Sequence, residues 1–204
     1  MKVNYSKMTE KIIKENEAKG HVPRLLLHSC CAPCSSSVLE YLSEHFKVTI
    51  LFFNPNITET EEYNKRLEEQ NEFIANFKAK NTISIIEGEY NKDIFYDFAK
   101  DYKDEPEGGK RCLECYSLRL KETAKIAKEM KFDYFTTTLS VSPMKNAELL
   151  NQLGSQLEEE YDVKYLYSDF KKKEGYKRSI ELSKDYGLYR QDYCGCIYSK
   201  NNTK

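Results

Sequence analysis

Positions 24–37 of the chain read RLLLHSCCAPCSSS, and this stretch predicts a strand, a turn and the start of a helix. Leu25, Leu26 and Leu27 form a continuous apolar run, which is typical of a parallel strand buried on both faces. Pro33 suits the first turn of a helix, and Ser35 is a good residue for its N-terminus. We therefore expect a strand and a helix joined by a turn that carries three thiols.

The same alternation of strand and helix continues along the chain. Apolar residues at helical spacing extend the first helix to about Lys47. A second buried strand is predicted at 48–53, and further strands are predicted at 82–87, 133–139 and 163–167. Helices are predicted at about 59–80, 90–102 and 145–161, and another begins at Cys112. Strands that alternate with crossover helices indicate a doubly wound α/β domain with a parallel sheet covered on both faces.

Three segments follow from this pattern. Residues 1–23 are predicted to be a polar leader with some helical character at 8–18, and residues 24–168 form the α/β domain. Residues 169–204 are polar and basic, and we expect one or two helices there, packed on the same domain beside the carboxyl edge of the sheet.

Composition restricts the class of protein. The 204 residues are 40% hydrophobic and 32% charged, with a formal net charge of -1, which is typical of a globular chain with a single core and not of a disordered or coiled-coil protein. No apolar run approaches the roughly 18 residues of a membrane span, and the first twenty residues do not resemble a secretory signal. We expect a cytoplasmic protein without a membrane partner.

The seven cysteines are the strongest chemical signal. They fall into three tight groups, which are Cys30, Cys31 and Cys34, then Cys112 and Cys115, then Cys194 and Cys196. An odd number of clustered cysteines in a reducing compartment favours metal or redox chemistry over disulfide staples. The first group follows the first strand, where open parallel sheets bind ligands, and a helix N-terminus there favours thiolates.

The number of cysteines does not by itself identify the metal. Cys30 and Cys31 together with Cys112 and Cys115 offer four thiolates, which suit tetrahedral zinc or a [4Fe-4S] cluster equally well. Adjacent cysteines at a strand end make an awkward zinc knuckle, so structural zinc is the less favoured alternative. Cys194 and Cys196 flank a glycine, and such a pair can form a strained, easily reduced disulfide or hold an iron ion.

Five motifs together resemble the cobalamin-independent epoxyqueuosine reductase family. They lie at residues 26–34, 53–57, 111–116, 136–143 and 190–196, and the resemblance covers about residues 24–199. It implies a Rossmann-like fold of the nucleotide-hydrolase type that bears a [4Fe-4S] cluster beside a second, singly coordinated iron. It also implies reductive removal of the epoxide oxygen of epoxyqueuosine in the tRNA anticodon loop, which gives queuosine in the last step of its biosynthesis.

The resemblance also assigns roles to the cysteines. It implies that Cys30, Cys31, Cys112 and Cys115 ligate the cluster. Cys194 and Cys196 become a redox-active pair or ligands of the second iron, and Cys34 is a further candidate ligand of that iron.

Other residues complete the expected site. Asp192 and His28 are candidates for proton delivery, although a lone histidine is more often a buried, hydrogen-bonded residue. The basic stretch from Lys171 to Arg190 is interleaved with tyrosines, as in proteins that hold single-stranded RNA, although charge runs are usually solvated surface. The residues expected to bind the substrate are Asn54, Asn56, Lys145, Lys177, Arg178 and Arg190.

Two other functions compete with this one. An ATP-dependent tRNA-modifying or sulfur-transfer enzyme of the same fold would need a glycine-rich phosphate loop after the first strand, and residues 28–34 contain no glycine. A non-catalytic zinc module that docks RNA would bind zinc and lack redox activity. The reductase also requires an electron donor, which the sequence does not identify.

Overall fold

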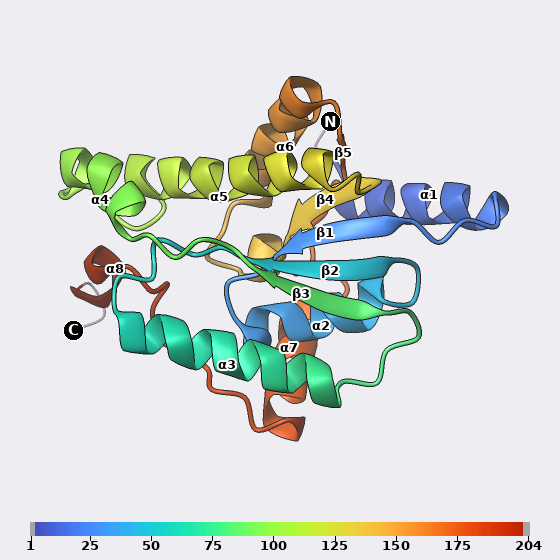
Figure 1. Ribbon diagram of the computed structural model, residues 1–204, viewed down its shortest axis with the longest axis horizontal. Coiled ribbons are helices and arrows are strands. Elements are labelled where there is room, and N and C mark those ends of the chain that lie inside the picture. Colours follow the sequence, from blue (N-terminus) through green and yellow to red (C-terminus); the bar gives the residue numbers. More distant parts are fainter. Residues whose placement is uncertain (1–2, 202–204) are drawn as a thin grey trace.

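Five parallel strands form one sheet in the order β3-β2-β1-β4-β5 (Figure 1). The computed structural model describes residues 3–201. The strands are β1 (Arg24–His28), β2 (Lys47–Phe52), β3 (Ile83–Glu87), β4 (Tyr134–Thr137) and β5 (Lys164–Tyr165). The α-helices are α1 (Tyr5–Ala18), α2 (Ala32–Leu42), α3 (Thr60–Asn76), α4 (Asp93–Ala99), α5 (Lys110–Glu129), α6 (Ala147–Tyr161), α7 (Gly175–Asp185) and α8 (Ile197–Asn201).

Helices cover both faces of the sheet, and the predicted doubly wound α/β fold is confirmed. Leu25 and Leu27 point into a core shared with α2 and α3, whereas Leu26 points into a second core shared with α5 and α6. Figure 1 shows these two helical layers on opposite sides of the strands. All three leucines are fully buried, as a strand between two helical layers requires.

Several predicted elements are too long. The first helix ends at Leu42 and not near Lys47, because Lys47 already pairs with Arg24 in the sheet. The helix predicted at 59–80 ends at Asn76, and the one predicted at 90–102 comprises α4 and a short 3-10 turn. The strand predicted at 133–139 stops at Thr137, where a 3-10 turn, Thr138–Val141, begins.

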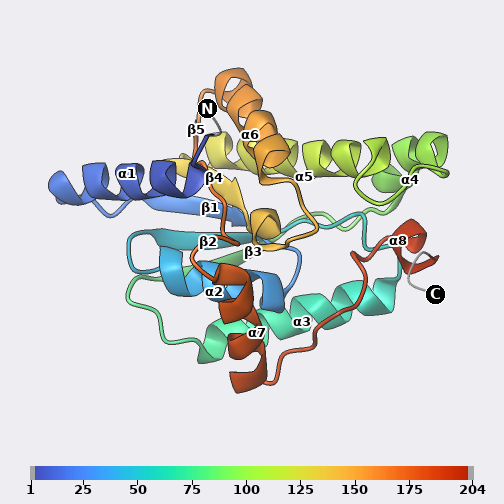
Figure 2. The same ribbon diagram turned by 180° about the vertical axis from the view of Figure 1, so that it is seen from behind.

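The segments at the two ends of the chain pack on the sheet domain. In α1, Ile13 joins the core on the α2 side, and Thr9 donates a hydrogen bond to the carbonyl of Tyr167. Of the C-terminal helices, α8 lies at the carboxyl edge of the sheet, whereas α7 lies against α2 (Figure 2). Residues 1–2 of the predicted leader and residues 202–204 of the C-terminal segment lie outside the described residues. Within the described part, no helix is both long and apolar enough to cross a membrane.

Candidate active site

The strand order reverses between β1 and β4, and the candidate site lies at their carboxyl ends. From β1 the chain builds outward to β2 and β3, then crosses back to β4 on the other side of β1. Such a switch point leaves a crevice in which open parallel sheets bind ligands. A pocket of about 430 Å³ lies there, lined by the turn after β1, the segment after β4, α7 and residues 190–194.

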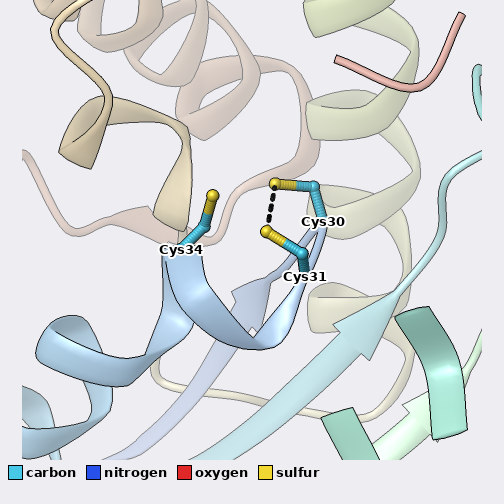
Figure 3. Close-up of side chains that lie close together, drawn as sticks. All are labelled: Cys30, Cys31 and Cys34. Atoms are coloured by element: carbon cyan, nitrogen blue, oxygen red, sulfur yellow. Dashed lines mark hydrogen bonds between the residues drawn. The ribbon is translucent and has the colours of Figure 1, made fainter. Parts of the chain in front are cut away.

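Cys30, Cys31 and Cys34 form the first thiol group in the turn from β1 to α2. Their three sulfur atoms lie within 4.8 Å of one another, and the Sγ atoms of Cys30 and Cys31 are 3.8 Å apart (Figure 3). Cys31 is the extended residue that precedes α2, and Cys34 lies in the first turn of that helix. The sequence therefore brings three sulfurs together without any contribution from a distant segment.

The three thiols differ in pKa. Hydrogen bonds from Cys31 and Cys34 hold the pKa of Cys30 well below its usual range, and the Arg119 charge acts in the same direction. Burial raises the pKa of Cys31, and the Cys30 thiolate raises the pKa of Cys34. Gln191 donates to the Sγ of Cys31 at 2.8 Å. One thiolate beside two further sulfurs is a ligand set for a soft metal.

The other four cysteines line a small cavity. Cys112 and Cys115 stand one turn apart at the start of α5, and Cys194 and Cys196 reach the same cavity from the C-terminal segment. Backbone amides donate to two of the sulfurs, from Gly108 to Cys112 at 3.2 Å and from Ser199 to Cys196 at 3.4 Å. Burial raises the pKa of Cys115 to about 12. None of the seven cysteines is in a disulfide.

Arg66 of α3 holds the C-G-C segment in place. Its guanidinium donates to the carbonyls of Cys194 and Tyr193, at 3.3 and 3.4 Å, and pairs with Glu62 on the same helix. The carbonyl of Gly195 accepts from the backbone amide of Thr58. No sequence pattern predicts this role of Arg66, because the carbonyls to which it donates lie more than 120 residues away and no local motif marks the contact.

Lys145 connects the two regions of the site. Its ammonium lies 3.5 Å from the Sγ of Cys194 and 3.4 Å from Oε1 of Glu107, and the side chain is buried. Burial opposes the charge of Lys145, but Cys194, Tyr116 and Glu107 together raise its pKa. Cys194 and Glu107 line both the large pocket and the small cavity. Glu107, in the loop before α5, was not predicted to belong to the site.

Arg119 lies in α5, one turn beyond Cys115, and is completely buried. Its Nε donates to the carbonyl of Cys115 at 3.1 Å. Its positive charge acts on Cys115, Cys194 and Cys30, so the thiol groups share one electrostatic environment.

The structure brings only some of the predicted substrate and proton-delivery residues to the large pocket. Lys145, Arg190 and Asp192 line it. Asn54 is fully buried and donates from Nδ2 to the carbonyl of Ser29, and Asn56 faces the small cavity.

His28 does not line the pocket either. Its ring bonds to the hydroxyl of Thr137 at 2.9 Å and to the carbonyl of Phe53 at 3.2 Å. Burial lowers the pKa of His28 to about 4, so the ring is neutral at pH 7. The histidine therefore ties β1 to the neighbouring strand ends instead of facing a ligand.

Two of the predicted basic residues also lie outside the pocket lining. Lys177 is exposed and forms an ion pair with Glu174. Arg178 is bound through two nitrogens to Glu40 of α2, at 2.7 and 2.9 Å, and also pairs with Glu181. The rim of the pocket instead carries Met144 and Tyr176, which are among the exposed large hydrophobic side chains.

These features define a Rossmann-like α/β protein with a thiol-lined site suited to a soft metal. Residues 25–202 match the model of a protein family described as epoxyqueuosine reductase QueH, and the chain belongs to this family. The resemblance inferred from the motifs is thereby confirmed.

Several relatives carry the name epoxyqueuosine reductase QueH. The one from Staphylococcus epidermidis is 47% identical over 202 residues, which are 97% of this chain and 85% of the relative. The one from Staphylococcus aureus is 44% identical, over 97% of this chain and 84% of the relative. The one from Thermotoga maritima is 37% identical, over 86% of this chain and 89% of the relative.

Proposed function

We propose that this chain is an epoxyqueuosine reductase that converts epoxyqueuosine in tRNA to queuosine. The reaction takes two electrons and two protons, breaks both C–O bonds of the epoxide, forms a C=C bond and releases the oxygen as water. The observation that carries the proposal is the convergence of seven thiols beside a pocket at the switch point of the sheet, in a chain of this family.

The proposed cofactor is a [4Fe-4S] cluster held by Cys30, Cys31, Cys112 and Cys115. The donor set fits, because thiolates are the ligands of such clusters and the charge of Arg119 interacts with Cys30 of one pair and Cys115 of the other. The buried Nη atoms of Arg119 lack a hydrogen-bond partner among the described residues, which is what an anionic group beside them would supply. When bound, such a cluster supplies electrons one at a time.

The three remaining thiols are proposed for the second redox site. Cys34 lines the large pocket together with Cys194, and Cys196 follows from the same loop. These residues bind the second iron under one account. Under the other account, Cys194 and Cys196 cycle between dithiol and disulfide, and Cys34 takes no part.

Two charged side chains in the pocket are proposed to act on the epoxide oxygen. The buried ammonium of Lys145 offers positive charge to an oxygen that becomes negative as its C–O bond breaks. Asp192 is exposed at the same pocket and is a candidate proton carrier. Neither role requires these residues to bind the metal.

The rim of the pocket suits a nucleotide in an RNA loop. Tyr176 and Met144 offer exposed apolar surface against which an unpaired base can stack, and Arg190 offers a charge for phosphate. The guanidinium of Arg190 lies 5.9 Å from the Tyr176 ring, so both groups act on the same part of the substrate.

The test is anaerobic purification followed by metal analysis and turnover. We expect iron and labile sulfide in the protein, a visible absorption band, and conversion of epoxyqueuosine in tRNA under reducing conditions. Colourless protein that contains zinc and no sulfide would refute the cofactor. Conversion of free epoxyqueuosine as readily as of modified tRNA would refute the requirement for the polymer.

A further inference from the structure

Arg119 is a buried cation, and some of its N–H groups have no hydrogen-bond acceptor among the described residues. Its side chain has no exposed surface, and its Nη1 and Nη2 atoms are buried without a hydrogen-bond partner in residues 3–201. Only Nε is used, in the bond to the Cys115 carbonyl. A buried guanidinium with four unsatisfied N–H groups costs several kcal/mol, so a fold retains it only where a negative partner is present.

No carboxylate in the described part of the chain forms an ion pair with Arg119. Glu107, which lines the same small cavity, pairs with Lys145 instead. Burial lowers the pKa of Arg119, but interactions with Cys115, Cys194, Cys30 and Tyr116 together raise it, so these are the groups nearest to its charge.

The position of Arg119 on α5 directs it toward the thiols. Cys112, Cys115 and Arg119 are separated by three and four residues, so they lie on one face of the helix. The small cavity is lined by this face and by Cys194 and Cys196. Two other buried arginines near the site use their Nη atoms within the protein: Arg66 pairs with Glu62, and Nη1 of Arg111 donates to the carbonyls of Tyr102 and Glu105, although Nε of Arg111 has no partner in residues 3–201.

We propose that Arg119 is a positioning residue for the thiolate-held centre. Its Nη1 and Nη2 atoms donate hydrogen bonds to sulfur atoms of that centre, and its fixed charge offsets the negative charge that each incoming electron adds. Both effects stabilise the reduced form and make the reduction potential less negative. This inference rests on the proposed iron–sulfur cofactor.

The test compares two substitutions in the anaerobically purified holoprotein. Arg119→Met keeps an unbranched side chain of similar length without the charge, and Arg119→Lys restores the charge. We measure iron and sulfide content and the midpoint potential by redox titration of the visible absorbance. We expect the Met variant to have a more negative potential, with the reduced-to-oxidised ratio lower by on the order of tenfold at a fixed potential, which is 59 mV for one electron. The Lys variant should recover most of this shift.

A second measurement covers the case in which the Met variant does not load the cofactor. In metal-free protein the unpaired guanidinium destabilises the fold, so Arg119→Met should be at least as stable as the metal-free wild type in urea unfolding. Lower stability of the Met variant would make Arg119 a structural residue and overturn the inference.

The two proposals fail in distinguishable ways. A fully loaded Arg119→Met protein with an unchanged potential overturns the role of Arg119 and leaves the cofactor intact. Wild-type protein without iron and sulfide refutes the cofactor, and the role of Arg119 with it.

Discussion

Cys34 stands between the two accounts of the second redox site. Its sulfur lies within 4.8 Å of the Cys30 and Cys31 sulfurs, and it also lines the large pocket together with Cys194. It is therefore close enough to the first group to share its charge and exposed enough to contact a ligand in the pocket. Substituting Cys34 therefore distinguishes the two hypotheses, a metal site of three thiolates and a Cys194–Cys196 dithiol that works without metal.

We expect Cys34→Ser to remove one iron per chain and most of the activity if Cys34, Cys194 and Cys196 hold the second iron, because a serine hydroxyl is a poor ligand for a site built from soft donors. Cluster absorbance and sulfide content should stay unchanged. Iron analysis, the visible spectrum and turnover measure these quantities together. Full activity with unchanged iron would contradict the three-thiolate site and leave the Cys194–Cys196 dithiol.

Residue spacing revealed the thiols but not the groups that control them. Adjacent cysteines and a C-x-x-C spacing are local features, so their chemistry is visible in the sequence. Arg66 and Gln191 contact the site across 128 and 160 residues, and these contacts exist only in the folded chain. Asn54 shows the opposite error. It lies in a family motif and was expected to bind the substrate, but its side-chain amide is buried and donates to the backbone carbonyl of Ser29.

At the scale of elements, the C-G-C segment depends on the backbone of Gly195. This residue has a φ of +114°, and an added Cβ would lie 2.9 Å from Cγ1 of Ile57. Both the backbone conformation and the close approach therefore require glycine. Together with the contacts of Arg66, they fix the turn between Cys194 and Cys196, which line the same small cavity.

We expect Gly195→Ala to displace this turn and lower turnover strongly, with a destabilisation of about 2 kcal/mol from backbone strain and overpacking. Gly187→Ala is the matched control, because Gly187 has a φ of +63° but open space around it. The control should cost about 1 kcal/mol and leave turnover intact. Urea unfolding and turnover of both variants provide the comparison. Equal activity of the two variants would show that the position of the turn is not critical.

The C-terminal helix α7 and the segment after it differ in how their charges are used. Arg178 on α7 is neutralised by Glu40 and Glu181. Arg190 instead reaches the pocket, where it hydrogen-bonds to the Ser179 carbonyl and the Ser183 hydroxyl and, among residues 3–201, pairs with no carboxylate. A charge already paired with carboxylates gains less from a phosphate than one that is not.

We expect Arg190→Gln to weaken tRNA binding and to reduce the slope of log K against log salt by about 1. Arg178→Gln should change both much less. Binding titrations at several salt concentrations measure the two slopes. An equal loss in the Arg178 variant would instead support the wider basic surface that includes Lys177, which was the expectation from sequence.

Sequence patterns predicted the order of the elements better than their ends. Runs such as 25–27 and 48–53 are buried on both faces, which makes a parallel strand the simplest interpretation, and the family motifs agree with it. The strand predicted at 163–167 is only two residues long, Lys164–Tyr165, which pair with Tyr134 and Phe135 of β4. Beyond these pairs the Leu166 carbonyl accepts from the side-chain hydroxyl of Thr136. A strand's length depends on its neighbour, which a local pattern does not describe.

In the whole molecule, the candidate site joins segments that are far apart along the chain. Residues 30–34, 112–115 and 194–196 all meet at the carboxyl edge of the sheet. The C-terminal segment between α7 and α8 is held there by few backbone hydrogen bonds, among them the bond from Thr58 to the Gly195 carbonyl. A metal centre bound by these thiols would therefore stabilise the native fold and close long loops, because the ligands come together only in the folded chain.

We expect removal of the metal to lower the melting temperature by roughly 5 °C or more, which corresponds to about 2 kcal/mol for a domain of this size. Tryptic cleavage at Arg190 should also become faster, since the segment that carries it loses an attachment at Cys194 and Cys196. Thermal unfolding and limited proteolysis of the anaerobically loaded and the chelator-treated protein measure both effects.

The double variant Cys194→Ser, Cys196→Ser is the control for this prediction. If these two cysteines hold iron, the loaded variant should be cleaved at Arg190 as fast as the metal-free wild type. If they form only a redox dithiol, the loaded variant should be cleaved as slowly as the loaded wild type. Identical melting and cleavage with and without metal would show that the centre does not contribute to the stability of the fold.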